Sequence, residues 1–214
     1  MARDVFVTGG TGYVGSPLIE ALLARGHIVR ALTRAASASR LPAGAVSVIG
    51  NALEPAGWTA HIAPADTFVH LIGTPHPSPL KAAEFQSVDL VSVRTAVQAA
   101  AAAGVRHFVY VSVAHPAPMM HAFIAVRQQG EAMIADSRLP ATILRPWYIL
   151  GPGHRWPYVL VPMYALMRLV PSLKAGAERL ALLPRQAVID TIVRCIESPP
   201  DRLTVLEAPQ ITRG

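Results

Sequence analysis

The sequence predicts a doubly wound α/β fold, in which helices cover both faces of a mostly parallel β-sheet. Short runs of β-branched and aromatic residues alternate with longer stretches rich in Ala and Leu, which have helical length. A glycine-rich bend directly follows the first of the short runs. Because consecutive parallel strands need a crossover connection, each intervening helix is expected to pack on one face of the sheet.

The expected elements follow one another without an internal repeat. Strands are expected at residues 5–7, 28–32, 46–49, 67–72, 107–111, 141–144 and 204–206. Helices are expected at about residues 13–25, 84–103, 120–137 and 183–197. Gly26 and Gly104 follow two of these helices, at the position where glycine commonly ends a helix.

The C-terminal third differs in composition from the rest of the chain. Residues 156–173 are apolar but are interrupted by three prolines and carry Arg168. We therefore favour a short cap helix over a pocket and expect no transmembrane segment. The chain is expected to form a single dinucleotide-binding domain over residues 1–214, with residues 150–214 contributing a reduced cap on the substrate side.

Composition excludes several other classes of protein. Of the 214 residues, 52% are hydrophobic and only 15% are charged, which excludes a disordered chain. The net charge of +6 does not come from a basic tract with interleaved aromatics, so an anionic small ligand is favoured over nucleic acid. With Cys195 alone and no secretory signal at the start, a cytoplasmic location is expected.

The strongest local motif is the bend at residues 8–15, with the sequence Thr-Gly-Gly-Thr-Gly-Tyr-Val-Gly. Its first glycine permits a sharp turn, and the next lets a pyrophosphate approach backbone amides at the positive end of a helix. The last allows close packing of helix on sheet. A purely structural turn is the less favoured alternative. The residues expected to bind a dinucleotide here are Gly9, Thr11, Gly12, Tyr13, Val14 and Gly15.

The segment after the second strand indicates which dinucleotide is bound. An acidic residue there would bind the adenosine ribose and repel a 2′-phosphate, but residues 28–50 contain none. Arg34 follows the strand end, where a guanidinium can hold the 2′-phosphate through two parallel hydrogen bonds. We therefore expect NADP(H) in preference to NAD(H). Gly73, after the fourth strand, is expected to let the cofactor pass close to the backbone.

Together these features resemble the atypical and extended short-chain dehydrogenase/reductases. Their compact NAD(P)H-binding members include relatives of NmrA-type regulators and of the nucleotide-binding accessory subunit of respiratory complex I. The resemblance covers roughly residues 3–155 and implies a Rossmann-type sheet. The C-terminal part is similar to a shortened version of the family's substrate lobe. Four segments carry the resemblance: the glycine bend, Ala31–Arg34, Val109–Ser112, and Ile143–Pro146 followed by Gly151–Gly153.

In active members of that family, a Ser polarises the substrate carbonyl and a Tyr four residues before a Lys donates the proton. Ser112 matches the serine, whereas the tyrosine and lysine positions hold Phe123 and Arg127. Phenylalanine has no exchangeable proton, and a guanidinium does not deprotonate at neutral pH. Arg127 keeps the positive charge and is expected to bind the nicotinamide ribose. Candidate substitute donors are His115, His121 and Tyr148.

Several residues are candidates for an apolar pocket wall, although core packing explains each of them equally well: Met119, Met120, Trp147, Tyr148 and Trp156. Such a wall would take a small apolar or quinone-like ligand. No metal site is expected, because the eight histidines are dispersed and Cys195 has no partner. The chain lacks the Gly-x-Ser-x-Gly motif of α/β-hydrolases. Asp89 is expected to make a structural hydrogen bond near the cofactor.

Three functions remain open. The first is an NADP(H)-binding protein with weak or no redox turnover, such as a sensor, regulator or assembly factor. The second is an NADPH-dependent reductase or isomerase of a small apolar carbonyl compound, in which Ser112 acts with a different proton donor. The third and least favoured is a nucleic-acid-binding regulator. Phe123 favours the first over the second, and the sequence leaves the partner and the oligomeric state open.

Overall fold

Seven parallel strands form the central sheet of the computed structural model, which describes residues 1–153 and 159–212 apart from the side chains at positions 165 and 168. Their order across the sheet is β3-β2-β1-β4-β5-β6-β9. The predicted doubly wound, Rossmann-type α/β sheet is therefore confirmed. The strands are β1 (Asp4–Thr8), β2 (Ile28–Thr33), β3 (Val46–Ile49), β4 (Thr67–His70), β5 (His107–Val111), β6 (Ala141–Arg145) and β9 (Thr204–Glu207).

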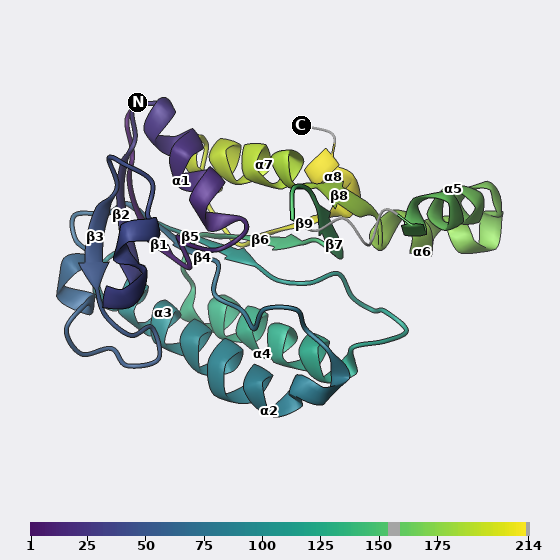
Figure 1. The fold of residues 1–214 in the computed structure, drawn as a ribbon, viewed down its shortest axis with the longest axis horizontal. Coiled ribbons are helices and arrows are strands. Elements are labelled where there is room, and N and C mark those ends of the chain that lie inside the picture. Colours follow the sequence, from purple (N-terminus) through teal and green to yellow (C-terminus); the bar gives the residue numbers. More distant parts are fainter. Residues whose placement is uncertain (154–158, 213–214) are drawn as a thin grey trace.

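Helices cover both faces of this sheet (Figure 1). One face carries α1 (Gly15–Ala24), α7 (Arg185–Glu197) and α8 (Ala208–Thr212). The other carries α2 (Ala82–Glu84), the π-helical turn η4 (Phe85–Leu90), α3 (Val91–Ala102) and α4 (His121–Ser137). Short 3₁₀ turns lie in the connections, at η1 (Ala35–Arg40), η2 (Thr59–His61) and η3 (Pro79–Lys81).

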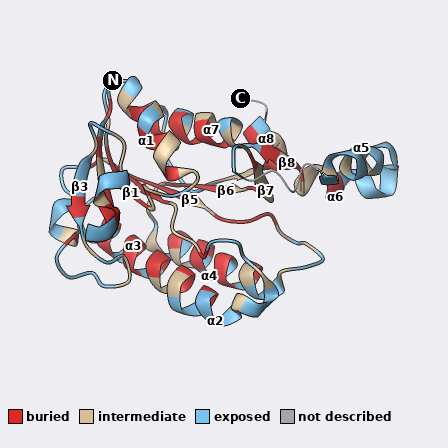
Figure 2. Cartoon of the chain, viewed as in Figure 1, coloured by how far each residue is buried: buried red, intermediate tan, exposed pale blue. Residues whose placement is uncertain are grey.

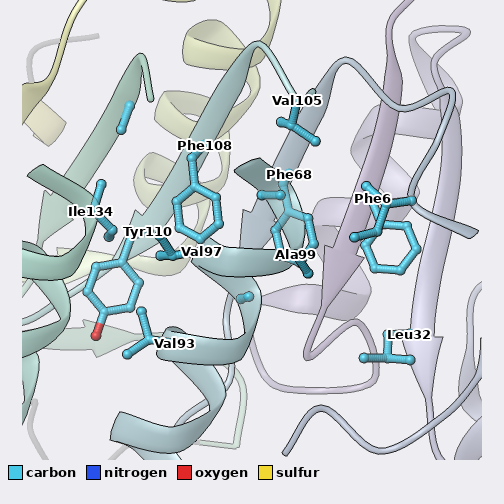
Figure 3. Packing of buried hydrophobic residues seen from close by; sticks show 14 of the residues in the cluster. Phe6, Leu32, Phe68, Val93, Val97, Ala99, Val105, Phe108, Tyr110 and Ile134 are labelled. Carbon is cyan, nitrogen blue, oxygen red and sulfur yellow. The ribbon is translucent and has the colours of Figure 1, made fainter. Parts of the chain in front are cut away.

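Alternating side chains along each strand supply two hydrophobic cores. Val5 and Val7 of β1 join the cluster beneath α1 and α7, whereas Phe6 between them joins the cluster beneath α3 and α4. In the cluster beneath α3 and α4, Phe6, Phe68 and Phe108 occupy paired positions on three adjacent strands (Figure 3). The ring centroids of Phe6 and Phe68 are 5.2 Å apart, and those of Phe68 and Phe108 are 5.3 Å apart. Burial is concentrated on the inner faces of these helices (Figure 2). This packing fixes the strand ends that form the site.

The C-terminal part differs most from the sequence-based expectation. The region expected to hold a short cap helix contains the short helix α5 (Val161–Leu169), followed by a second helix, α6 (Pro171–Arg179), that was not expected. Val170 between them is extended, as a residue before proline prefers. The predicted helix start at residue 183 is wrong, because β8 (Leu182–Pro184) pairs with β7 (Tyr148–Leu150) in a small second sheet. Trp156 lies outside the described residues.

Two further boundaries differ from the prediction. The fourth strand ends at His70 rather than at residue 72, because its partner strand β1 ends at Thr8. The helix expected over residues 84–103 is interrupted by η4, whose wider turn belongs to neither α2 nor α3. Within the described residues, no helix combines the length and the apolar character that crossing a membrane requires. The division into one domain with a reduced cap stays a prediction.

Candidate functional site

The carboxyl ends of the parallel strands meet at one edge, where the sequence-predicted site residues come together. The strand order reverses between β1 and β4, and in such sheets a ligand crevice lies outside this reversal point. The glycine bend follows β1 there, Gly73 lies three residues after β4, and Ser112 follows β5 directly. The register pairs Thr8 with His70 and His70 with Tyr110, so the three strands end at the same level.

The glycine bend needs its glycines for geometric reasons. Gly9 has φ +79°, a backbone conformation that disfavours a side chain, and its carbonyl accepts a hydrogen bond of 3.0 Å from the Gly12 N–H. A Cβ at Gly15 would collide with the Gly9 carbonyl oxygen. No side chain caps the N-terminus of α1. Its partly positive end therefore lies at the reversal point, where it suits an anionic group.

The remaining residues of the bend have different neighbours. Thr11 is half-buried and Gly12 is exposed. The ring of Tyr13 lies under the Arg185 guanidinium, whose Cζ is 4.8 Å from the ring centroid, and Arg185 also donates a 3.3 Å hydrogen bond to the Tyr13 carbonyl. Val14 lines a pocket. Contacts of these residues with a cofactor stay a prediction.

Arg34 follows β2 directly and is exposed at the same edge of the sheet. The other two arginines of this region have partners within the protein. Arg30 donates to Asp4 at 2.7 Å, and Arg40 donates to Ser37 at 2.8 Å. Arg34 therefore differs from both in its position at the strand end, which is the position where a 2′-phosphate contact is expected.

Arg127 of α4 is buried and carries an ion pair. Its Nη2 lies 2.7 Å from Oδ1 of the fully buried Asp89, and its Nη1 donates to the Tyr110 hydroxyl and the Val111 carbonyl, each at 3.2 Å. Burial acts to lower the pKa of Arg127, but Tyr110 and Asp89 outweigh it and raise that pKa above its ordinary value. The guanidinium is therefore held charged by the fold itself.

Asp89 also ties down the loop that follows β4. Its Oδ2 accepts hydrogen bonds from the backbone N–H of Thr74 at 2.9 Å and from the Thr74 hydroxyl at 2.6 Å, so Asp89 makes the structural contact expected of it. Gly73, which immediately precedes Thr74, lies against Arg127: a Cβ at this position would collide with Nη2 of the guanidinium. The absence of a side chain at Gly73 thus makes room for Arg127, and its contact with a cofactor stays a prediction.

Ser112 takes part in a buried polar cluster that sequence reasoning missed. Its hydroxyl donates to Oε1 of Glu131 at 2.5 Å, and Arg145 forms an ion pair with the other carboxylate oxygen of Glu131 at 2.5 Å. Nε2 of His115 lies 3.5 Å from Glu131 Oε1. The hydrogen bond from Arg145 to Glu131 contributes most to raising the pKa of Arg145. One signal was available in the sequence, because Glu131 lies one helical turn after Arg127.

A cavity of about 190 Å³ lies beside Ser112 and Arg127. Phe123 lines it, with its ring centroid 5.0 Å from the Arg127 Cζ. Trp147 lines it as expected of an apolar wall, whereas Met119 is 53% exposed and Met120 packs against the core. The lining residues are Val14, Leu71, Pro77, Val111, Ser112, Val113, Phe123, Arg127, Pro146, Trp147 and Ile149.

A larger, shallow groove of about 520 Å³ adjoins the loop after β5. Residues 116–118 of this loop form one side and α6 forms the other, with Leu173 and Met167 among the apolar side chains that line it. Arg179 also lines the groove and donates a hydrogen bond of 3.2 Å to the Pro116 carbonyl. Across the described residues, no group of three or more His, Cys, Asp or Glu side chains is placed to hold a metal ion.

A glycine bend at the reversal point of a parallel sheet defines a dinucleotide-binding protein of the Rossmann type. The sequence profile of a family described as NAD(P)H-binding matches residues 9–199. The chain therefore belongs to this NAD(P)H-binding family, within the superfamily of atypical and extended short-chain dehydrogenase/reductases.

Two curated relatives are reductases. The chain is 27% identical over 205 residues to the ceramide reductase of Caulobacter vibrioides, covering 93% of this chain and 64% of that protein. It is 28% identical over 168 residues to the 4-hydroxy-2-methyl-3-oxo-4-farnesyl-3,4-dihydroquinoline-1-oxide ketoreductase of Stigmatella aurantiaca, covering 68% of this chain and 50% of that protein. The chain thus spans about half to two thirds of the length of these relatives.

A solved structure supports the fold. The enzyme WbmH of Bordetella bronchiseptica, solved in complex with NAD+, superposes with a TM-score of 0.72 at 20% sequence identity. The superposition covers 96% of this chain and 75% of that one. At this level of identity, the likeness establishes the shared Rossmann-type architecture.

Proposed function

We propose that the chain binds NADP(H) across the carboxyl edge of its sheet and that its redox turnover is weak or absent. In this arrangement the pyrophosphate lies on the glycine bend, and Arg34 binds the 2′-phosphate. The nicotinamide lies near the cavity beside Ser112, with Arg127 at its rim. A protein of this kind acts as a cofactor-dependent sensor or regulator, or as a slow oxidoreductase.

The observation that carries this proposal is the position of Phe123 in the cavity wall. The family resemblance places a proton-donating tyrosine there, and a phenyl ring has no proton to give. The hydroxyl of Ser112 is directed toward Glu131, and the cation of Arg127 is paired with Asp89. Loss of general acid catalysis lowers a rate by about 10²–10⁴-fold. The arrangement thus supports cofactor binding better than fast reduction.

The ligand that shares this site is proposed to be an apolar carbonyl or quinone-like compound. Apolar side chains dominate the lining of the cavity, and apolar residues also line the groove between α6 and the loop after β5. The two reductase relatives are named for ceramide and for a farnesyl-substituted compound, both of which carry hydrocarbon chains. A hydrocarbon chain fits the groove between α6 and the loop after β5.

The test is NADPH consumption with long-chain ketones and quinones, measured for the wild type and for Phe123→Tyr. The wild type should enhance NADPH fluorescence on binding yet oxidise the cofactor slowly. Phe123→Tyr should raise the rate by about 10²-fold or more, because it restores a proton donor. Phe123→Leu is the matched control, since it replaces the aromatic ring with another apolar side chain and adds no proton-donating group. A wild-type rate typical of ordinary reductases would refute the proposal.

A second candidate is a genuine NADPH-dependent reductase, which the cluster around Glu131 favours. His115 and Ser112 both face Oε1 of Glu131: Nε2 of His115 lies 3.5 Å from it without a hydrogen bond, and the Ser112 hydroxyl donates to it at 2.5 Å. In this second candidate His115 closes that gap during turnover, so that a proton can pass through Glu131 toward Ser112 at the cavity. If this candidate holds, His115→Gln should abolish turnover while NADPH binding persists. The exposed His121→Gln should leave turnover unchanged.

A further inference from the structure

The hairpin formed by α5 and α6 has an apolar outer surface that the rest of the described chain leaves uncovered. Leu166 and Leu169, both on α5, are 65% and 78% exposed. Figure 1 shows the hairpin projecting beyond the end of the sheet, and Figure 2 shows α5 coloured largely as exposed. The exposed apolar residues of this hairpin surface are Val159, Val161, Met163, Leu166, Leu169, Val170 and Leu173.

This exposure is not the ordinary solvent face of an amphipathic helix. Met163, Leu166 and Leu169 recur every three residues along α5 and therefore share one side of it. Met167, four residues after Met163, flanks the same side and lines the groove. Only the edge of this apolar side is therefore used for packing, and a cluster of exposed apolar residues on the remainder marks an interaction site.

Charge indicates which partner suits the hairpin surface. Residues 159–179 contain three basic residues and one acidic residue, within a chain of net charge +6. Lys174 lies exposed on α6, next to Leu173 of the apolar surface. A symmetric contact with a second copy would bring two cationic surfaces together. An anionic lipid surface instead offers both hydrocarbon and complementary negative charge.

We propose that the α5–α6 hairpin docks this protein on the surface of an anionic phospholipid bilayer. Leu166 and Leu169 enter the boundary between headgroups and acyl chains, while Lys174 meets the phosphate groups. The hairpin lies on the bilayer and does not span it, because each of its helices has nine residues, far fewer than the about 20 that spanning needs. The proposal goes beyond cofactor binding and does not depend on it.

The test is co-sedimentation of the full chain with vesicles of phosphatidylcholine alone or of phosphatidylcholine with phosphatidylglycerol. The wild type should bind the anionic vesicles at least about tenfold more tightly than the neutral ones, and added salt should weaken this binding. The double variant Leu166→Glu/Leu169→Glu should lose binding by about tenfold or more.

The matched control is Ile28→Glu/Val46→Glu, which alters two exposed apolar residues on β2 and β3, at the opposite end of the sheet from the hairpin. Both double variants lower the net charge from +6 by two, to +4, so a change in overall charge alone cannot separate them. Equal far-ultraviolet circular dichroism of all variants would establish that each is folded. The control should bind like the wild type.

Three outcomes would overturn the proposal. Absence of binding to anionic vesicles would remove the membrane role, and equal binding to neutral vesicles would remove the anionic recognition. Light scattering that shows a lipid-free dimer, converted to monomer by Leu166→Glu/Leu169→Glu, would assign the hairpin surface to a second copy of the chain instead.

Discussion

Arg127 stands where the family resemblance places a lysine, and an arginine there can make different contacts with its positive charge. A lysine ammonium is a compact point charge, whereas a guanidinium is a planar fork that can serve several acceptors at once. Here the fork reaches Asp89 with one nitrogen, and reaches both Tyr110 and Val111 with the other. The cation is thus engaged with the protein interior before any ligand arrives. Its proposed contact with the nicotinamide ribose would add to these bonds.

At the same scale, Arg34 is expected to decide the choice of cofactor. Arg34→Ala should raise the Kd for NADPH by about 10- to 100-fold, because it removes charge-assisted hydrogen bonds to the 2′-phosphate. The Kd for NADH, which lacks this phosphate, should change little. Fluorescence titration of both cofactors measures the two constants.

The matched control is Arg94→Ala, which removes an exposed arginine from α3 and changes the net charge equally. It should leave both constants unchanged. If Arg34→Ala retains the wild-type preference for NADPH, Arg34 does not contact the 2′-phosphate.

Residues with local sequence signals were the predictable part of the candidate site. Gly9, Gly15 and Arg34 stand in short motifs next to a strand, so their position at one edge of the sheet followed from the alternation alone. Glu131 was missed because its role depends on Ser112, which is 19 residues away, and on the packing of α4 against the sheet. Composition and spacing carry little information about such tertiary pairs.

At the scale of elements, η4 is a short π-helical turn with a structural consequence. π-Helical turns are rare and recur at functional sites. This one carries Asp89, which joins the loop after β4 to α4 through Thr74 and Arg127. Three separate elements therefore depend on one carboxylate that is shielded from water.

Asp89→Asn should lower the free energy of unfolding by about 3–5 kcal/mol, because it leaves the Arg127 charge buried without a counterion. Urea denaturation measures the change. The double variant Asp89→Asn/Arg127→Gln should recover part of the loss, since the uncompensated charge is gone. Arg106→Gln breaks an ion pair in which Arg106 is 74% exposed, and it should have no measurable effect. Equal losses for the single and double variants would show that the ion pair is not the cause.

Two strands carry buried histidines that predict a pH dependence of stability. Burial, reinforced by the charge of Arg127, lowers the pKa of His70 on β4 to about 3. Burial and the charge of Arg3 lower the pKa of His107 on β5 to about 4, against an opposing effect of Asp66. Between these values and the unfolded pKa of about 6.5, the unfolded chain binds protons that the native chain does not.

The free energy of unfolding should therefore fall as pH drops below about 6.5, by up to about 1.4 kcal/mol per pH unit for each histidine. Urea denaturation at several pH values between 6.5 and 4 measures this slope. His70→Gln should flatten the slope by about half, whereas His61→Gln, at an exposed position, should leave it unchanged. A slope that is the same in His70→Gln and the wild type would contradict the assignment.

The elements that sequence reasoning found are those long enough to show a period. Six of the seven sheet strands matched their expected ranges to within one residue at either end, because buried β-branched runs are distinctive. β7 and β8 have three residues each and show no period at all. The break at Val170 does have a local signal, because Pro171 follows it and favours an extended residue before it, but a single short helix within residues 156–173 was expected.

At the scale of the whole molecule, the carboxyl edge of the sheet beside the glycine bend and the α5–α6 hairpin lie on different parts of one framework (Figure 1). The glycine bend belongs to β1 and α1, which are embedded in the hydrophobic core. The hairpin connects to that core through α6, where Ala177 is buried. Cofactor binding should therefore stabilise the whole sheet and should not require the exposed face of α5.

Thermal denaturation is expected to report this coupling directly. A ligand present at 100 times its Kd stabilises the native state by about 2.7 kcal/mol, which corresponds to a rise in Tm of about 5–10 °C for a chain of this size. NADPH should produce such a rise in the wild type and in Leu166→Glu/Leu169→Glu alike. Gly15→Ala should lose it, because the added methyl group meets the Gly9 carbonyl and disturbs the bend. Gly176→Ala, where a Cβ meets nothing within 4 Å, should keep it. Since Gly15→Ala also lowers the Tm without ligand, the difference in Tm with and without NADPH is the measurement. Should that difference survive in Gly15→Ala, the pyrophosphate does not lie on the glycine bend.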